Sequence, residues 1–171
     1  LIIFGPPGAG KGTQANFIVN KFNLYQLSTG QILRNEIKNK TELGKEISSI
    51  INSGSLVSDE IVKKLVENFI SDQKYNNRLI FDGYPRNLTQ AKTLNELLTK
   101  YDQKINLVLK LSVSLKTIKK RILERRNIEK RADDNEENAI KRYETYEKST
   151  EPVIEYYKKL NLLKLINGER S

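Results

Sequence analysis

Residues 1–14 of the chain read LIIFGPPGAGKGTQ, a stretch that predicts a strand followed by a phosphate-binding loop. The apolar run LIIF stops at Gly5, a pattern typical of a buried parallel strand. The glycines and Lys11 have the spacing of a phosphate loop, in which backbone N–H groups turn towards phosphate oxygens at the positive end of a helix. Lys11 is followed by Gly12, and the hydroxyl comes one place later at Thr13. The loop therefore differs from the G-K-[ST] form of GTPases and motor ATPases.

The rest of the chain alternates short apolar runs with segments of helical periodicity. Further strands are predicted at residues 25–27, 79–81, 105–111 and 162–166. Helices are predicted at residues 10–22, from a capping box at 28–31 onward, at 42–52, 59–71, 87–100, 115–126 and 133–149, and from Pro152. Strands alternating with helices over short connections indicate a parallel sheet covered on both faces. We therefore expect one α/β domain over residues 1–171, with three layers and a five-stranded parallel sheet.

The composition fits a globular domain and limits its chemistry. The sequence of 171 residues has no Cys and no His, which excludes disulfides, thiolate zinc sites and imidazole catalysis. No apolar run approaches the roughly 20 residues of a membrane span. The net charge of +9 comes mainly from lysines on helix faces predicted to be exposed, so we do not expect nucleic acid to be the main partner. Because Leu1 is not Met and the first strand begins at once, we expect further residues upstream.

The loop sequence GPPGAGKGTQ resembles that of the nucleoside monophosphate kinases, and of the adenylate kinase family most of all. Later segments resemble the family's motifs in the same order along nearly the whole chain. STGQILR at residues 28–34 resembles STGDxLR, GSLVSDE at 54–60 resembles GxLVPDE, and DGYPR at 82–86 with Gln90 resembles DGFPRxxxQ. The arginines that resemble the family's lid and core positions are Arg121, Arg125, Arg131 and Arg142. The resemblance implies the phosphate-loop nucleoside monophosphate kinase fold.

The resemblance also implies an enzyme that reversibly transfers the terminal phosphate of Mg-ATP to AMP and gives two ADP. Such a transfer needs no protein base, because it depends on two aligned anions, neutralised charge and the exclusion of water. The residues to which the resemblance gives catalytic roles are Lys11, Asp82, Arg86, Arg121, Arg131 and Arg142. Mg²⁺ is expected to be held through ATP and water near Thr13 and Asp82, without a direct protein ligand, and no zinc is expected.

The nucleotide-binding residues implied by the resemblance fall into two sets. Those expected to bind ATP are Gly8, Ala9, Gly10, Lys11, Gly12, Thr13, Arg121, Arg125 and Arg170. Those expected to bind AMP are Thr29, Gly30, Arg34, Ser55, Leu56, Val57, Gly83, Tyr84, Pro85, Arg86, Gln90, Arg131 and Arg142. Any one of these arginines, taken alone, could instead be a solvated surface residue that binds no phosphate. Their joint placement at motif positions favours recognition of phosphate.

The acceptor base has to be decided locally, because adenylate kinases and UMP/CMP kinases share most of these motifs. Thr29 stands where the pyrimidine enzymes tend to have Ala, and the Gln90 amide can pair with the edge of adenine. Against this, Asn87 directly follows Arg86, a feature that the pyrimidine enzymes also show. We expect AMP as the acceptor and keep a UMP/CMP kinase of the same fold as the alternative. A nucleotide-binding module without transfer is a second alternative, which the intact arginines disfavour.

The family pattern further implies an acceptor-binding flap at about residues 28–57 and a short lid at about residues 125–132. Gln31, Ser58 and Lys130 replace the family's usual Asp, Pro and Gly, so their local contacts stay open. The family continues into one more helix beyond the end of this chain, and we expect that helix to be missing here. The resemblance suggests a cytoplasmic monomer whose partners are ATP, AMP and ADP, without nucleic acid or membrane.

Two adjacent carboxylates lie in the predicted lid region. Asp133 and Asp134 are expected to begin the helix at 133–149, since negative charge is favourable at a helix N-terminus. A second interpretation is that they hold arginines of the lid.

Overall fold

The computed structural model describes residues 1–129 and 134–169, and residues 130–133 and 170–171 lie outside this description. The elements in chain order are β1 (Ile2–Phe4), α1 (Lys11–Phe22), β2 (Tyr25–Ser28), α2 (Thr29–Lys38), α3 (Glu42–Asn52), α4 (Asp59–Ser71), η1 (Gln73–Tyr75), β3 (Leu79–Asp82), α5 (Leu88–Lys100), β4 (Val108–Ser112), α6 (Leu115–Glu129), α7 (Glu136–Thr145), η2 (Tyr146–Thr150), α8 (Glu151–Lys159) and β5 (Leu163–Asn167). In the described ranges no helix combines the length and the apolar character needed to cross a membrane.

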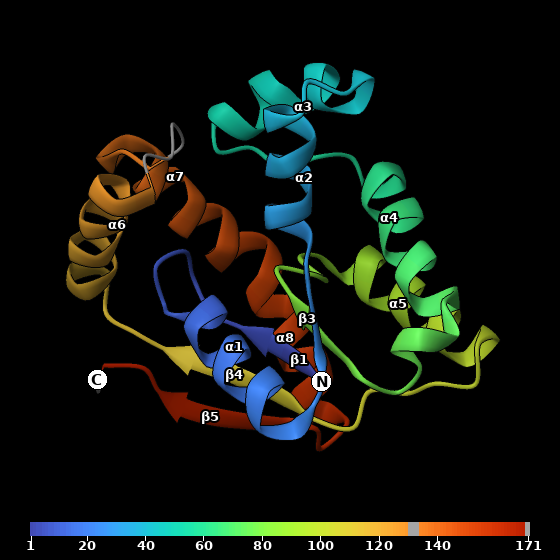
Figure 1. Cartoon of the computed structure of the whole chain (residues 1–171). Helices are drawn as coiled ribbons and strands as arrows, with labels where there is room; N and C mark the ends of the chain where they lie inside the picture. Colours follow the sequence, from blue (N-terminus) through green and yellow to red (C-terminus); the bar gives the residue numbers. More distant parts are fainter. Residues whose placement is uncertain (130–133, 170–171) are drawn as a thin grey trace.

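The sheet has five parallel strands in the order β2-β3-β1-β4-β5, which confirms the predicted α/β class and the five-stranded sheet. β1 lies at the centre, between β3 and β4 (Figure 1). In the register of β1 and β3, Ile3 lies opposite Asp82. The segments that follow these two strands therefore leave the sheet side by side.

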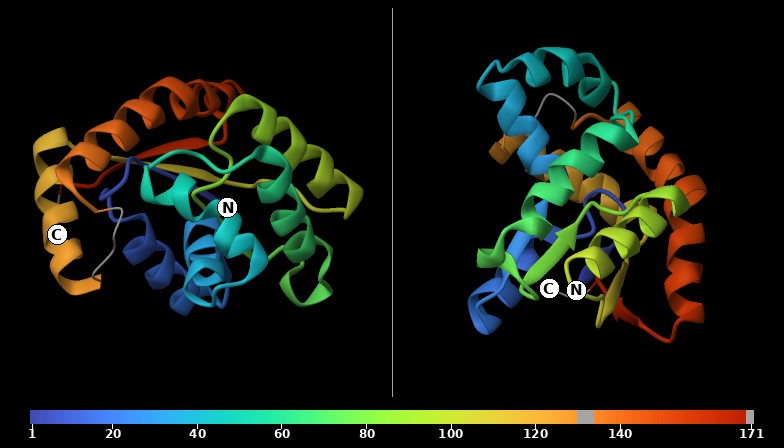
Figure 2. Two further views of the ribbon diagram at one scale, coloured as in Figure 1. Left: turned by 90° about the horizontal axis from the view of Figure 1, so that it is seen from above. Right: turned by 90° about the vertical axis from the view of Figure 1, so that its right-hand side faces the viewer.

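Helices cover both faces of the sheet, as Figures 1 and 2 show. Successive side chains of a strand point to opposite faces, and β1 follows this rule. Ile3 packs with Ala15 of α1 on one face. Ile2 and Phe4 pack on the other face with residues of α5 and α8, among them Leu94 and Tyr157. The three predicted layers are therefore present.

The connections that follow β1 and β3 run to opposite sides of the sheet, so the boundary between these two strands is a topological switch point. The helix after β1, α1, covers one face of the sheet, whereas α5, the helix after β3, covers the opposite face. In open α/β sheets such a switch point leaves a crevice at the carboxyl ends of the strands, where ligands bind. A ligand site is therefore expected between the segments at residues 5–10 and 83–87.

Helices α2 and α3 project from the sheet on the side of its carboxyl ends (Figures 1 and 2). The two helices approach closely at Gly44, which is buried. A Cβ at this position would lie 2.1 Å from the carbonyl oxygen of Glu36 on α2. Only glycine allows this contact between the two backbones.

Several local predictions differ from the structure. The capping box predicted at 28–31 is wrong, because Ser28 stands at the N-cap position of α2 but its side chain makes no capping hydrogen bond. The strand predicted at 105–111 begins only at Val108. Phe22 lies two helical turns after the buried Ala15 on α1, a spacing that favours burial, yet it is 60% exposed.

The C-terminal helical region also differs from its prediction. The helix starts at Glu136 rather than at Asp133, and the side chain of Asn135 caps it by accepting from Asn138 N–H. The helix predicted from Pro152 is α8, which begins one residue earlier, at Glu151. α7, the π-helical turn η2 and α8 follow one another without a break, and Pro152 lies in the first turn of α8. Proline has no backbone N–H to donate. It is tolerated in the first turn of α8, where the π-helical turn before it already departs from the regular α-helical hydrogen-bond pattern.

We expect Gly44→Ala to lower the free energy of unfolding by about 1–3 kcal/mol, because the added methyl group forces α2 and α3 apart. Chemical denaturation measures the effect, with Ser49→Ala on the exposed side of α3 as the control, expected within about 0.5 kcal/mol of the parent. Helix propensity alone would make Ala the better residue by up to about 1 kcal/mol. A Gly44→Ala protein as stable as the parent would show that the contact is not tight.

Candidate active site

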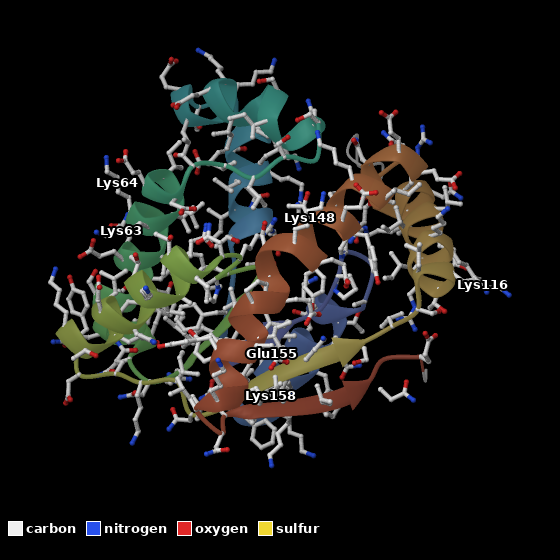
Figure 3. The ribbon with its side chains drawn as sticks, turned by 180° about the vertical axis from the view of Figure 1, so that it is seen from behind. Lys63, Lys64, Lys116, Lys148, Glu155 and Lys158 are labelled. Carbon is white, nitrogen blue, oxygen red and sulfur yellow. The ribbon has the colours of Figure 1, made fainter. Side chains whose placement is uncertain are left out.

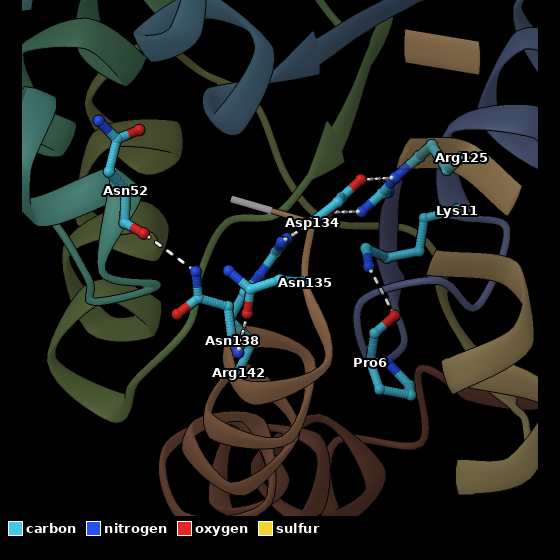
Figure 4. A network of polar contacts seen from close by, with 8 residues as sticks. All are labelled: Pro6, Lys11, Asn52, Arg125, Asp134, Asn135, Asn138 and Arg142. Carbon is cyan, nitrogen blue, oxygen red and sulfur yellow. Dashed lines mark hydrogen bonds and ion pairs between the residues drawn. The ribbon is translucent and has the colours of Figure 1, made fainter. Parts of the chain in front are cut away.

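The loop between β1 and α1 forms a cradle of backbone groups. Gly8 and Gly10 have φ angles of 80° and 91°, left-handed conformations that glycine adopts without steric strain. Gly10 is the N-cap of α1, so the N–H groups of the first helical turn lie beside the loop. The Nζ atom of Lys11 donates to the carbonyl oxygens of Gly5 at 2.8 Å and Pro6 at 3.1 Å (Figure 4 shows the contact with Pro6). Backbone donors and an ammonium group at the positive end of a helix suit a phosphate chain.

The charge of Lys11 is poorly solvated in this position. Burial lowers the pKa of its ammonium group to about 8. The Asp82 carboxylate acts in the opposite direction, whereas nearby guanidinium groups lower the pKa further. These groups belong to Arg86, Arg142 and Arg125. An anion that enters beside Lys11 would relieve this repulsion.

The carboxyl end of β3 provides the opposite wall. Asp82 is buried, and its Oδ2 accepts a hydrogen bond of 2.8 Å from Nε2 of Gln26 on β2. The carbonyl oxygen of Gly83 accepts from the Thr29 hydroxyl at 3.0 Å and from Nε of Arg86 at 2.7 Å. A Cβ at residue 83 would lie 3.1 Å from the Arg86 guanidinium, so the glycine leaves room for that side chain.

Arg86 is held along its backbone as well as at its side chain. Its N–H donates to Oε1 of Gln90 at 2.7 Å, and its carbonyl oxygen accepts from the Thr150 hydroxyl at 3.0 Å. Thr150 comes from the π-helical turn η2, on the other side of the crevice. Burial lowers the pKa of Arg86, and the Asp82 carboxylate opposes this shift. A guanidinium group that is fixed and partly desolvated is suited to neutralise a phosphate.

Gln90 lies in a network at the start of α5. Its Nε2 donates to Oδ1 of Asp59 at 2.7 Å. Asn87 donates from Nδ2 to both oxygens of Asp59, at 3.1 and 3.2 Å, and its Oδ1 caps α5 by accepting from Gln90 N–H at 2.8 Å. Gln90 is only 4% exposed, and the Tyr84 hydroxyl donates to its carbonyl oxygen at 3.2 Å.

Two cavities meet at this end of the sheet. The first is bordered by the loop residues Gly5, Pro7 and Lys11. The second is bordered by residues from α2, the segment before α4, and α5, among them Thr29, Gly30, Arg34, Ser55, Val57 and Gln90. The residues that line both cavities are Gly54, Leu56, Gly83, Arg86 and Arg142. Two guanidinium groups therefore stand where the cavities adjoin.

Asp134 joins the arginines of two helices. It is fully buried, and its two oxygens accept from Nε and Nη2 of Arg125, both at 2.6 Å. Nη1 of Arg142 lies 3.3 Å from Oδ1 (Figure 4). Asp134 therefore does not act as the helix N-terminus that was predicted, whereas the second interpretation, that it holds arginines, is confirmed. Asp133 lies outside the described residues.

Arg121 lies one helical turn before Arg125 and reaches the loop. Its guanidinium group donates to the carbonyl oxygens of Gly168 at 2.9 Å and Ala9 at 3.5 Å. α6 therefore presents two arginines on one face, as the i, i+4 spacing predicts.

Helix α7 also contacts the segment that follows α3. Asn138 donates from Nδ2 to the carbonyl oxygen of Asn52 at 3.0 Å, and Nζ of Lys141 donates to that of Ser53 at 2.8 Å (Figure 4 shows the first contact). These carbonyls belong to the C-terminal end of α3, where donors and cations are favourable. Gly54 is buried beneath Arg142, since a Cβ there would lie 3.2 Å from Arg142 Cγ.

Some of the predicted site residues line the two cavities, and others do not. Tyr84 is buried in the core, and Pro85 lines the first cavity, on the side of Lys11 rather than of Thr29. Thr13 is exposed on the first turn of α1. The other loop residues of the prediction, Gly8, Ala9, Gly10 and Gly12, contribute backbone of the loop and of α1. Arg131 and Arg170 were predicted to bind nucleotide and lie outside the described residues.

Four residues of the network were missed by the sequence analysis. Asp59 stands in the segment 54–60, which was singled out without a role for its carboxylate. Gln26, Thr150 and Lys141 carried no sequence signal, because each acts on a partner that is distant in the sequence.

The chain resembles known proteins over nearly its whole length. Residues 3–162 match the sequence profile of the family described as "Adenylate kinase". Proteins named "Adenylate kinase" include one from Pelagibacter ubique strain HTCC1062, 44% identical over 98% of this chain and 91% of its own length. Another, from Fusobacterium nucleatum, is 43% identical over 99% of this chain and 91% of its own length. A third, from Prochlorococcus marinus strain MIT 9515, is 46% identical over 99% and 90%.

We expect the affinity for ATP to fall as the pH rises above about 8, because Lys11 then loses its proton in the unliganded protein. The phosphates do not change charge in this range, since their last pKa lies near 6. The loss should approach tenfold per pH unit until the pKa of the complex is reached. Calorimetric titrations at pH 7–10, in buffers of different protonation enthalpy, should show uptake of close to one proton near pH 9. A constant affinity without proton uptake would contradict the pKa.

We expect Asp134→Asn to lower the free energy of unfolding by about 3 kcal/mol, since it removes the buried charge that compensates Arg125 and Arg142. Thermal and urea denaturation measure the effect. Glu144→Gln, on the exposed side of α7, removes the same charge and should change stability by less than about 0.5 kcal/mol. Equal effects of the two substitutions would show that only the net charge matters.

Proposed function

The chain belongs to the adenylate kinase family, and from this membership we propose how its residues divide the transfer of a phosphoryl group between them. It is a phosphotransferase that acts on ATP and AMP, reversibly giving two ADP. The proposal rests mainly on one observation, that Arg86 and Arg142 line both of two adjoining cavities. The transferred group crosses between the cavities at these two side chains.

The first cavity receives the phosphate chain of ATP. The backbone of residues 8–13 surrounds the phosphates, and the Lys11 ammonium group leaves the carbonyl oxygens of Gly5 and Pro6 for phosphate oxygens. Arg121 contacts the same loop from α6, and the charge of Arg125 acts on Lys11. Arg131 and Arg170 keep the roles that the resemblance implies, as donors to the phosphates and near the base of ATP.

The second cavity receives AMP. Leu56 and Val57 supply an apolar slot for the base, and Gln90 borders it with a polar edge. Arg34, Arg86 and Arg142 line this cavity, and they bind the acceptor phosphate. Asn87, the residue that favoured a UMP/CMP kinase, caps α5 and binds Asp59, so its presence has a structural reason that is independent of the base.

The residues at the end of β3 fit the Mg²⁺ ion that the family uses with ATP. Magnesium prefers oxygen ligands and usually keeps several waters, bound through one or two carboxylates and substrate phosphates. Asp82 offers a carboxylate that Gln26 holds in place, and the Thr13 hydroxyl lies on the first turn of α1. In the described ranges no group of three or more His, Cys, Asp or Glu side chains could hold a metal ion. The ion, when bound, neutralises charge between the phosphates, while Asp82 orients its water ligands.

Residues 28–57 act as a flap over AMP, and residues 125–132 act as a short lid over ATP. The flap is built on α2 and α3, which project from the sheet (Figure 1). Its closure, together with that of the lid, would exclude water and protect ATP from hydrolysis. A chain without Cys and His lacks the usual ligands of a structural zinc, so we expect none in this lid.

We further propose a cytoplasmic monomer that acts on nucleotides without nucleic acid or membrane as a partner. Its labelled surface lysines lie on different elements: Lys63 and Lys64 on α4, Lys116 on α6, Lys148 in η2 and Lys158 on α8 (Figure 3). Lys158 pairs with Glu155 at 3.3 Å. Such a distribution supports solubility rather than the continuous basic track that binds nucleic acid.

We expect product analysis with Mg-ATP to show ADP at matched stoichiometry with AMP, and much slower transfer to GMP, UMP and CMP. The physical reason is the apolar slot at Leu56 and Val57 combined with the single amide of Gln90. Chromatographic separation of the nucleotides measures the outcome. Faster transfer to UMP or CMP would overturn the assignment of the second cavity to AMP.

We expect Arg86→Ala to lower kcat about 10²–10⁵-fold, because the guanidinium offsets charge that develops on the transferred group. The Arg78→Ala variant is the control, since this arginine donates to the carbonyl oxygen of Asn23 and lines neither cavity. Steady-state kinetics, with thermal unfolding as a check of folding, distinguish the variants. If kcat falls no further in Arg86→Ala than in the control, Arg86 is not a catalytic residue.

A further inference from the structure

We propose that Asp59 is a specificity-determining residue, which selects the acceptor base by fixing the orientation of the Gln90 amide. Asp59 acts as a positioning residue, because it acts on the base through Gln90. The inference rests on the proposed function, in which the second cavity receives the base of the acceptor.

The two ends of the Gln90 amide have partners that allow only one orientation. Oε1 accepts from the backbone N–H of Arg86 at 2.7 Å, and this group can only donate. Nε2 donates to a carboxylate oxygen of Asp59 at 2.7 Å, and an ionised carboxylate can only accept. A reversed amide would place N–H against N–H and oxygen against oxygen. At most positions the two orientations of an amide are hard to distinguish, whereas here the partners decide between them.

Asp59 is itself held in place at the start of α4. It is the first residue of that helix, where a carboxylate is favourable. Asn87 donates from Nδ2 to both of its oxygens, while Oδ1 of Asn87 accepts from the N–H of Gln90. The closed ring of Asp59, Asn87 and Gln90 joins α4 to α5. The carboxylate therefore sits at a fixed place relative to the amide.

The fixed amide keeps hydrogen-bonding capacity for a ligand. An amide has two N–H groups and two oxygen lone pairs, and one of each is used by Asp59 and Arg86. The amide borders the second cavity, so the remaining lone pair and N–H define an acceptor beside a donor in a set order. A base matches this order when it offers an N–H₂ donor beside a ring-nitrogen acceptor.

AMP and IMP test this order with the smallest chemical change. Adenine offers the N6 amino group as a donor beside ring-nitrogen acceptors. Hypoxanthine replaces that amino group by an oxygen acceptor, and its N1 carries a proton. IMP therefore places acceptor against acceptor at an amide that both partners hold in one orientation. An amide released from Asp59 is held only by the N–H of Arg86, so it can turn over to match IMP at the cost of that one hydrogen bond.

The experiment compares kcat/KM for AMP and IMP, at saturating Mg-ATP, in the parent protein, Asp59→Ala, Asp59→Asn and the control Glu60→Gln. Glu60 is the next residue of α4 and carries the same charge in the same helical turn. In Asp59→Ala we expect the AMP to IMP ratio of kcat/KM to fall about tenfold, the discrimination that one well-oriented bidentate contact provides. The ratio should fall less in Asp59→Asn, whose Oδ1 can still accept from Gln90, and stay at the parent value in Glu60→Gln.

The outcomes separate the inference from the function on which it rests. An AMP to IMP ratio of kcat/KM that stays at the parent value in Asp59→Ala would overturn the inference alone. If kcat/KM falls equally for both substrates, Asp59 only stabilises the structure. A parent protein that uses AMP and IMP equally well would instead refute the contact between Gln90 and the base, and with it the proposed role of the second cavity.

Discussion

The parallel pairing of β1 with β3 is the constraint on which the rest of the site depends. Its register sets Ile3 opposite Asp82, so the phosphate loop and the segment 83–87 leave the sheet as neighbours. Because α1 and α5 cover opposite faces, the two segments diverge and leave a crevice between them. A register shift would turn Ile3 and Ile80 away from the face that α1 covers, so the same apolar packing that forms the core also fixes the distance between Lys11 and Asp82.

The site concentrates positive charge that its surroundings stabilise poorly. Burial lowers the pKa values of both Lys11 and Arg86, and the Asp82 carboxylate offsets these shifts only in part. Asp134 compensates Arg125 and Arg142 nearby. Preorganised cations of this kind attract phosphates strongly, because little reorganisation is needed when the anions arrive. Folding thus maintains an arrangement that is most favourable when polyphosphate is bound.

The sequence predicted the strands and the loop, which depend on adjacent residues, but not the contacts between residues that are far apart in the sequence. Apolar runs located all five strands, and the glycine pattern located the loop with Lys11, because both signals depend on adjacent residues. Asp134 was expected at a helix N-terminus, which is also a local interpretation, but its partner Arg125 lies on another helix. The contacts Gln26–Asp82 and Asp59–Gln90 join residues 56 and 31 positions apart, so no pattern along the chain signals them. Motif resemblance named Gln90 and Arg86 but gave no role to Asp59 and Thr150, which hold them.

Because α7, η2 and α8 follow one another without a break, the packing of α8 against the sheet fixes the direction in which the side chains of α7 point. α8 packs against the sheet through residues such as Tyr157, whereas α7 presents Asn138, Lys141 and Arg142 to the flap and the cavities. Each residue of an α-helix turns the chain by about 100°. The wide turn at η2 changes that count, and π-turns of this kind occur often at functional sites. Removing a single residue between the two helices would therefore keep the fold of each and rotate α7, so that its functional side chains would face away from the crevice.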